Sequence, residues 1–407
     1  MSSKVERSMN TLNATLNPAQ EADGRAAQKV VAVKPACVGV RHLSDVIAHT
    51  ERRIFHAGPP YRSPQDIPEP VLHSAAQAAV FEGWCTDVTE AMAAIRSGQI
   101  GMAAAQDHRL LVPLAGVLSP SMVVLEIADP ALDLLPIYVV LNEGQGSAAR
   151  LGRLDEGLTA HLQWLNGEFS AWLAQCFATP LDLLPLLAQA RALGDDCHAR
   201  STMGSGLIAT ALLQRAPQAS AETEKFLRES LAFALNFWMG AAALASSAAE
   251  GIPGSSLVTK AGGNGVEFGI QLAGRPGVWV CSSAPVPRGA IDAAHGARSA
   301  VGALGDSAVV DFCGLGGQSL QFAPLVLQGV SAALPADALQ RPERILACAV
   351  LELQEGLCAT SALRCVEAGV GPLVLIGMID KEGQAGRIGG GVVDVPVALF
   401  EHALAPQ

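Results

Sequence analysis

The chain has 407 residues, of which half are apolar and 16% are charged, with a formal net charge of -11 at pH 7. This length exceeds that of one ordinary hydrophobic core, so we expect two or three packed units. The apolar content excludes a disordered chain and predicts large buried surfaces, including a homo-oligomeric contact. The negative net charge argues against nucleic acid and anionic membranes as partners, because both bind surfaces with clustered lysine and arginine. Small molecules and other proteins remain.

The start of the chain and its cysteines bear on cellular location. Residues 1–30 lack the apolar run of a secretory signal, and we expect them to form a flexible tail. The nine cysteines are scattered and include no C-x-x-C pair, which favours reduced thiols over a disulfide framework. Together these features predict a cytoplasmic protein.

Residues 31–150 are predicted to form an α/β domain. VVAVKPACVGV suits a strand, and RIFH suits another that ends in a loop with Gly58, Pro59 and Pro60. VLHSAAQAAVFEGW has helical spacing, after which GVLSPSMVVLEI and PIYVVLNEGQG restore the strand pattern. This alternation predicts a Rossmann-like layer with a mainly parallel sheet.

Helical patterns dominate residues 151–250. Asp155 is a good N-cap for a helix with one apolar face, made by Leu158, Leu162, Leu165, Phe169 and Trp172. The uncharged stretch SLAFALNFWMGAAALASSAA, Ser230 to Ala249, could span a bilayer by length. Because Asn236 and several serines lie inside it and no basic flank orients it, we expect a buried helix instead.

Residues 251–407 are predicted to form an α+β domain. Apolar residues alternate with others from Val266 to Leu272, which predicts a half-buried strand that GRPG turns towards VWVC. AVVDF is a further apolar run. The last segment combines a helix at about Leu353 to Ala368, the strand-like PLVLIGMI and a glycine turn at RIGGG.

Several motifs with well-defined chemistry are absent from the sequence. It has no Gly-Lys pair of a Walker loop, no H-E-x-x-H or cysteine pair for zinc, and no G-x-S-x-G elbow. Nucleotide hydrolysis and common hydrolase mechanisms therefore lose support, and we expect neither a metal nor an organic cofactor.

The segment GDDCHARSTMGSG concentrates Asp195, Asp196, His198 and Arg200. An imidazole beside a guanidinium could move a proton and grip an anionic substrate. The alternative is a capping cluster, in which the aspartates accept hydrogen bonds from free backbone N–H groups at the start of a helix.

Three loops could contribute to a ligand site. AGGNGVEF and GLGGQS could expose backbone N–H groups to an anion, and HAGPPYR offers His56 and Arg62 near a strand end. Tight turns between strands and a plain strand exit are the alternatives.

Eight stretches resemble, in order, those of one known family. They are HAGPPYR at His56, FEGW at Phe81, SPSM at Ser119, LNEGQG at Leu141, GDDCHAR at Gly194, GGNGVEFGI at Gly262, GDSAVVDFCGLGG at Gly305 and GPLVLIGMIDKEGQAGRIGGGVVDVP at Gly371. The family is that of the AllG/YlbE-like proteins, and the resemblance covers nearly everything from about residue 35 to the end.

The resemblance implies an activity and partners. It implies a subunit of oxamate carbamoyltransferase that acts with two different companion subunits, one of them FdrA-like. The implied reaction converts oxalurate and phosphate into oxamate and carbamoyl phosphate, so the expected ligands are carbamoyl phosphate and oxamate or a related acid. The S-T-R-T and H-P-x-Q motifs of aspartate and ornithine carbamoyltransferases are absent, which predicts an unrelated phosphate site.

We assign hypothetical roles within these blocks. The predicted catalytic set is His198 for proton transfer, Arg200 for anion binding and Asp306 for orientation. Predicted substrate and phosphate contacts come from His56, Arg62, Asn142, Glu143, Asn264 and Lys381, and from the backbone of Gly263, Gly265, Gly316 and Gly317.

The chain departs from the family pattern at several positions. Relatives carry a His-His pair where this chain has Gln106-Asp107, and Asn, Asn, Asn and His where it has Arg109, Ser201, Leu375 and Asp380. A changed substrate, such as another amide or ureido acid, would account for this, because specificity follows the buried polar groups. A non-catalytic scaffold subunit of the same complex is the alternative.

Overall fold

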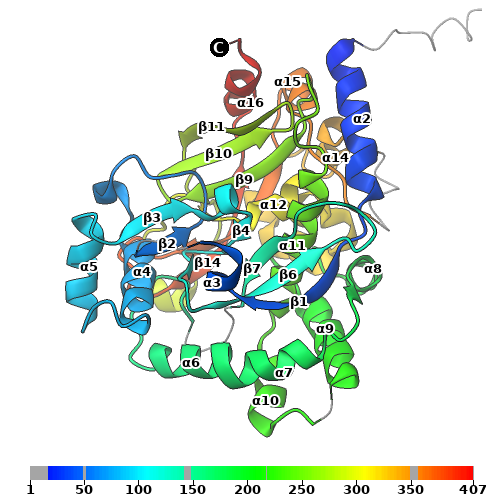
Figure 1. Cartoon of the computed structure of the whole chain (residues 1–407). Helices are drawn as coiled ribbons and strands as arrows, with labels where there is room; N and C mark the ends of the chain where they lie inside the picture. The colour runs from blue at the N-terminus through cyan, green and yellow to red at the C-terminus, as the bar shows by residue number, and fades with distance from the viewer. Residues whose placement is uncertain (1–16, 49–51, 142–147, 217, 349–355, 407) are drawn as a thin grey trace, which may run out of the picture.

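The computed structural model of the chain describes residues 17–48, 52–141, 148–216, 218–348 and 356–406. Several sheets and many helices pack together (Figure 1), which confirms the mixed α/β class. The longer helices are α2 Pro18–Ala32, α4 Glu69–Phe81, α5 Val88–Arg96, α8 Leu184–Ala192, α9 Thr202–Arg215, α10 Ala221–Glu229, α11 Phe233–Ser247 and α16 Val397–Leu404. The shorter ones are α3 Leu43–Val46, α6 Leu158–Trp164, α7 Ser170–Gln175, α12 Ala308–Phe312, α13 Pro324–Val330, α14 Arg341–Ile345 and α15 Ala362–Ala368.

The N-terminal half contains two sheets. The five-stranded sheet has the order β4 Leu110–Leu111, β7 Ile137–Val140, β6 Val123–Ala128, β1 Ala36–His42 and β8 Leu181–Asp182. The three-stranded sheet has the order β3 Gly101–Ala104, β2 Arg53–His56 and β5 Val117–Leu118.

The prediction of a mainly parallel, Rossmann-like sheet is wrong. In these two sheets only β4 with β7 and β2 with β3 run parallel, and the other described pairs are antiparallel. The connection from β6 to β7 is too short to hold a crossover helix, so these neighbours pair as an antiparallel ribbon. Strand-helix alternation in the sequence did not reveal this.

The C-terminal part contains two antiparallel sheets. One has the order β11 Arg275–Ser283, β10 Glu267–Leu272, β9 Val258–Asn264 and β12 Leu304–Gly305, and the other pairs β13 Leu373–Ile379 with β14 Arg387–Asp394. The predicted strand after Val266 and the strand PLVLIGMI are confirmed as β10 and β13. The predicted half-burial of β10 is wrong, because every residue after Glu267 is buried.

Two other predictions in this region are corrected. RIGGG is not a turn but the first part of β14, where its glycines allow a neighbouring segment to approach: a Cβ at Gly389 would lie 2.4 Å from the carbonyl oxygen of Ala290. The predicted helix around Leu353 to Ala368 begins outside the described residues, and within the described part it is helical from Ala362 to Ala368. Ser361 caps this helix by accepting a hydrogen bond from the Arg364 N–H.

The flexible tail predicted for residues 1–30 is wrong from Pro18 onwards, where the chain forms α2. Asn17 caps this helix by accepting a hydrogen bond from Gln20 N–H. Asp23 then ties it to the C-terminal part, because its buried carboxylate accepts hydrogen bonds from Ser255, Ser256 and Ser361. Figure 1 shows α2 (blue) near α14 and α15 (orange).

The stretch Ser230 to Ala249 forms a buried helix, as predicted. Residues Phe233 to Ser246 of α11 are all buried, and the helix packs against β6 and β7. A Cβ at Gly240 would lie 2.5 Å from Ile127 Cγ1, so this contact requires glycine. Among the described helices none alone has the length and hydropathy of a membrane span, whereas α10 and α11 together reach both but are bent by 69°.

The largest hydrophobic core crosses the predicted domain boundaries. It joins Val30 of α2, Leu125 and Val139 of the first sheet, Phe237 of α11 and Val310 of α12. Divisions at residues 150 and 250 remain a prediction, but they do not separate independent cores.

The expectation of reduced thiols is wrong for one pair. Cys348 and Cys358 form a disulfide with a Cα–Cα distance of 6.0 Å, and the other seven cysteines are free. Backbone pairing next to the two cysteines brings them together. Ala347 N–H donates to Ala359 O, and Leu346 and Thr360 form an isolated antiparallel β-bridge.

Candidate functional site

The segment from Gly305 to Gly317 contributes to two polar clusters. Near its start is Asp306, whose side chain is fully buried. One carboxylate oxygen accepts hydrogen bonds from Gly58 N–H (2.9 Å) and Gln106 Nε2 (2.6 Å), and the other accepts one from Val112 N–H (3.1 Å). Burial raises the pKa of Asp306 to about 7, although these donors oppose the shift. The carboxyl is thus poised near neutral pH.

The loop after β2 joins the loop after β9 beside Asp306. Tyr61 O–H donates to Asn264 O at 2.8 Å, and Asn264 Nδ2 donates to Pro59 O at 2.9 Å. Gly58 has a φ of +74°, and a Cβ there would lie 2.4 Å from the carbonyl carbon of Gly263. The structure therefore brings His56, Arg62, Gly263, Asn264, Gly265 and Asp306 into one region, which we name the Asp306 cluster.

Within this cluster His56 and Arg62 differ in exposure. His56 is 1% exposed, its Nδ1 lies 2.8 Å from Ala57 O, and its Nε2 has no hydrogen-bond partner among the described residues. Burial lowers the pKa of His56 to about 4, so the ring is neutral at pH 7. The Arg62 side chain is 80% exposed and pairs with Glu267. Arg62 therefore faces solvent and is partly neutralised.

The second cluster surrounds His198 and Asp311. His198 Nδ1 lies 2.6 Å from Asp311 Oδ2, and both side chains are buried. Asp311 Oδ1 also accepts hydrogen bonds from Gly317 N–H and Leu375 N–H, which fix the carboxylate. Burial alone lowers the pKa of His198, but the charge and hydrogen bond of Asp311, with the charge of Asp196, outweigh it and raise the pKa above the usual value.

Sequence reasoning missed Asp311. It lies in AVVDF, which forms α12, and its neighbours Val310 and Phe312 are buried apolar side chains. A lone carboxylate inside such a run is a signal in itself, because buried charges need partners. The partner, however, is 113 residues away in sequence, and no local pattern indicates it.

Of the two acidic neighbours of His198, Asp195 behaves as the capping interpretation predicts, whereas Asp196 binds the loop before the helix. Asp196 accepts hydrogen bonds from Ala199 N–H and Arg200 N–H, and Asp195 accepts one from Gly204 N–H in the first turn of α9. Asp195 also accepts from Arg200 Nε at 3.2 Å, and that guanidinium is about one-third exposed. Arg200 therefore keeps donors for a ligand, while the aspartates are structural.

The glycine N–H groups expected to meet an anion already donate within the chain. Gly265 donates to Ala303 O, Gly316 to Asp196 O and Gly317 to Asp311. Gly316 has a φ of +54°, and a Cβ there would lie 2.1 Å from Asp311 Oδ1. These glycines let the backbone approach a carboxylate of the protein itself, and ligand contacts by them remain a prediction.

A cavity of about 860 Å³ reaches Ala199, the residue after His198 in the sequence. Its other lining includes Arg288, Gly289 and Asp292, then Arg387, Gly390 and Asp394 of β14, and residues of α13. Arg288 Nη2 lies 3.9 Å from Asp394, and no described residue forms a hydrogen bond or ion pair with the Arg387 side chain. We name this the Arg387 cavity. Neither arginine was predicted, because each stands alone in a glycine-rich stretch.

Lys381, Asn142 and Glu143 were also predicted to contact the ligand. The Lys381 side chain is exposed after β13, and only its backbone N–H has a described hydrogen bond, to Ser299 O. Asn142 and Glu143 lie outside the described residues. No ligand role of these three residues is tested.

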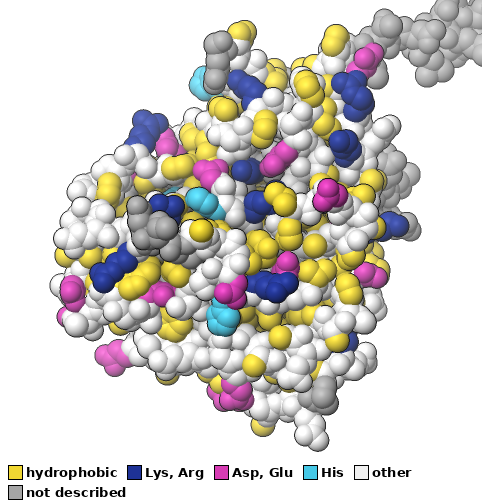
Figure 2. Space-filling view, in the orientation of Figure 1, with side chains coloured by type: hydrophobic (Ala, Val, Ile, Leu, Met, Phe, Trp, Pro, Cys, Tyr) yellow, Lys and Arg dark blue, Asp and Glu magenta, His cyan; other side chains and the backbone are white. Residues whose placement is uncertain are grey.

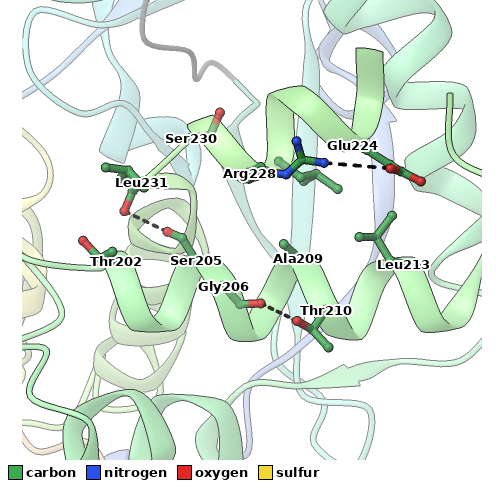
Figure 3. Close-up of a pocket in the computed structure, with 11 residues that line it drawn as sticks. Thr202, Ser205, Gly206, Ala209, Thr210, Leu213, Glu224, Arg228, Ser230 and Leu231 are labelled. Carbon is green, nitrogen blue, oxygen red and sulfur yellow. Dashed lines mark hydrogen bonds and ion pairs between the residues drawn. The ribbon is translucent and has the colours of Figure 1, made fainter. Parts of the chain in front are cut away.

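Another hollow lies between α9 and α10. It has a volume of about 280 Å³ and is lined by small and apolar residues with one Glu224–Arg228 ion pair (Figure 3). On the face in Figure 2, acidic and basic side chains are interspersed with apolar ones. Within the described residues, no group of three or more His, Cys, Asp or Glu side chains could hold a metal ion.

Comparisons with known proteins agree with the resemblance in the sequence. The family model described as "Oxamate carbamoyltransferase subunit AllG" matches residues 100–307, more than half of the chain. The chain is 29% identical to oxamate carbamoyltransferase subunit AllG of Escherichia coli (strain K12), covering 94% of this chain and 96% of the relative. It is 28% identical to the uncharacterized protein YahG of the same organism, covering 94% and 84%.

A solved structure shares the fold. The crystal structure of a conserved protein of unknown function from Enterococcus faecalis V583 matches with a TM-score of 0.86 and 29% identity, covering 95% of this chain and 96% of that one. Its architecture is therefore that of the present chain nearly from end to end. Sequence blocks, family model and whole-length relatives agree, and the chain belongs to the family of AllG subunits of oxamate carbamoyltransferase.

Proposed function

We propose that this chain is a catalytic subunit of a cytoplasmic carbamoyltransferase complex, working with an FdrA-like and a second companion subunit. The reaction transfers a carbamoyl group between phosphate and the nitrogen of oxamate or a related amide acid. The observation that carries the proposal is the His198–Asp311 pair, 2.6 Å apart, next in sequence to Ala199, which lines a cavity with two arginines.

The reaction requires one proton transfer and binding of two anions. When oxalurate is formed, the oxamate nitrogen attacks the carbamoyl carbon, the carbon–oxygen bond to phosphate breaks, and the nitrogen loses a proton. His198 Nε2 is suited to take that proton, because Asp311 holds Nδ1–H and stabilises the imidazolium that results. In the opposite direction the same nitrogen returns the proton.

The lining of the Arg387 cavity includes two arginines, Arg288 and Arg387, and two aspartates, Asp292 and Asp394. Arg341 already donates two hydrogen bonds to Asp394, so the cavity keeps positive charge for an anionic ligand. Guanidinium groups bind phosphate and carboxylate with two parallel donors. Arg387 has no described partner, and Arg288 is held only loosely by Asp394 at 3.9 Å. Arg200 follows Ala199 in the sequence and is about one-third exposed, so we include it as a third candidate cation.

The test uses the complex assembled from this chain and its two companions, with carbamoyl phosphate consumption as the readout. His198→Gln should lower kcat by roughly 10²- to 10⁴-fold, as expected for loss of a general base. Arg387→Met should chiefly raise KM for the phosphate-bearing substrate. Arg228→Met, on exposed α10, is the matched control and should leave turnover unchanged.

The pH profile separates a chemical from a structural role. Oxalurate formation requires neutral His198, so its rate should rise as pH passes through the raised pKa of this group. Asp311→Asn removes the charge that raises that pKa and should move the profile to lower pH. Full turnover in an assembled His198→Gln complex would reject the catalytic role.

One observation favours the scaffold alternative. No residue of α13 is buried although the helix is mostly apolar, and Leu325 is 63% exposed. An exposed apolar helix of this kind is typical of a protein contact. If Leu325→Glu abolishes assembly while His198→Gln and Arg387→Met keep full turnover, the chain organises partners that perform the chemistry.

A further inference from the structure

A second cavity lies apart from the site proposed above. It has a volume of about 270 Å³ and is bounded by β9, the start of β11, the end of α11 and the segment after β3. It shares no lining residue with the Arg387 cavity. Its charged lining consists of Asp107, Arg109, Glu250 and Lys260, which we name the four-charge cavity.

Asp107 is held firmly in this cavity. Its Oδ1 accepts hydrogen bonds from Trp279 Nε1 (2.9 Å) and Gln271 Nε2 (3.1 Å), and Lys260 Nζ lies 3.7 Å away. Gln271 is fully buried, so this support does not depend on a mobile surface group. No described donor hydrogen-bonds Oδ2, which leaves it for a ligand.

Arg109, which also lines this cavity, is held in place by its backbone conformation and by hydrogen bonds of its guanidinium group. It has a φ of +59°, a left-handed conformation that non-glycine residues adopt at a cost of about 1 kcal/mol or more. Its guanidinium donates through Nε to Pro136 O (2.9 Å) and through Nη2 to Leu135 O and Ser247 Oγ. Nη1 has no described partner. The backbone carbonyls around it thereby fix the direction of this cation.

The charges balance in a way that selects the ligand. Two cations, Arg109 and Lys260, and two carboxylates, Asp107 and Glu250, line one small volume. A ligand with only a negative charge would be attracted by the two cations but repelled by the two carboxylates. A ligand with only a positive charge would be attracted by the carboxylates but repelled by the cations. A ligand that carries both charges meets a partner for each. The volume of about 270 Å³ lies just below the usual range of small-molecule sites, which favours a small ligand.

We propose that the four-charge cavity binds a small zwitterion of the α-amino acid type. Its carboxylate lies towards Arg109 and Lys260, and its ammonium group lies towards Asp107 and Glu250. This site is separate from the His198–Asp311 pair, and the proposal does not rest on the carbamoyltransferase function.

Binding is measured calorimetrically on the full chain without companion subunits. The probes are glycine and L-alanine as zwitterions, acetate as a carboxylate alone, ethylammonium as a cation alone, and oxamate as a carboxylate with an uncharged amide. A zwitterion should bind at least about tenfold more tightly than acetate or ethylammonium, because it gains charge-assisted hydrogen bonds at both ends.

Two variants test the two ends without removing a described structural hydrogen bond of a side chain. Glu250→Gln should weaken zwitterion binding about tenfold and change oxamate binding little, because oxamate lacks the ammonium group. Lys260→Met should weaken both. Lys260→Arg should restore binding, and Arg387→Met, in the other cavity, should leave it unchanged.

The proposal is overturned if neither zwitterion binds more tightly than acetate, or if Arg387→Met weakens binding as much as Lys260→Met. Preferential binding of oxamate that Lys260→Met abolishes, and that Glu250→Gln and Arg387→Met leave intact, would also overturn it and would assign the cavity to an amide acid. Circular dichroism and thermal melting of each variant separate these results from a loss of fold.

Discussion

The buried carboxyl of Asp306 makes stability depend on pH. Its pKa rises from 3.8 to about 7 on folding, so the folded chain holds this proton more tightly than the unfolded chain. This group therefore contributes to the free energy of unfolding in full below about pH 4. The contribution, on the order of 4 kcal/mol, is lost as pH rises towards 7. Asp306→Asn should reduce the dependence of the free energy of unfolding on pH, measured by urea unfolding from pH 4 to 8.

His56 acts in the opposite direction over part of this interval. Burial lowers its pKa from 6.5 to about 4, so its contribution is present above pH 6.5 and is lost as pH falls towards 4. The difference between the profiles of Asp306→Asn and the unmodified chain therefore isolates Asp306. Parallel profiles would show that the carboxyl stays ionised in the folded chain.

At the scale of single elements, one buried side chain of α2 makes the hydrogen bonds that attach this helix to the C-terminal part. Asp23 accepts hydrogen bonds from the hydroxyls of Ser255, Ser256 and Ser361 and from Ser256 N–H, at 2.5 to 2.9 Å. Asp23→Ala leaves these buried donors without an acceptor, and we expect the free energy of unfolding to fall by about 3 kcal/mol. Limited proteolysis should then cleave α2 first.

Glu21→Ala is the matched control on the same helix, because Glu21 is exposed and its side chain has no described partner. It should change the free energy of unfolding by less than about 0.5 kcal/mol. Equal effects of the two substitutions would show that the serine contacts do not hold α2.

Elements with a strong local period could be predicted from the sequence, and those defined by distant partners could not. Alternation of apolar with other residues predicted β10, and continuous apolar runs predicted β13 and α11. The glycines of β14 have weak strand propensity, and only the approach of Gly289 and Ala290 accounts for them. In the same way the sequence identified His198, while Asp311 and Arg387 join it only through tertiary contacts.

At the scale of the whole molecule, one core holds distant segments together. Ile127 and Val139 pack around Gly240, and α11 also packs against α12 and β9. A fragment of residues 31–150 loses the helix that covers its sheet and should show no cooperative thermal transition, whereas the full chain should show one. A folded 31–150 fragment, seen by calorimetry, would restore the predicted domain boundary.

The two described ends of the chain meet at one place. Ala19 of α2 and Ala405 and Pro406 after α16 line the same hollow, of about 460 Å³. A short peptide bridge between these ends would thus give a backbone-cyclised protein with the same topology. Such a closed ring has fewer accessible unfolded conformations, so cyclisation offers a route to greater heat resistance that leaves both proposed ligand sites untouched.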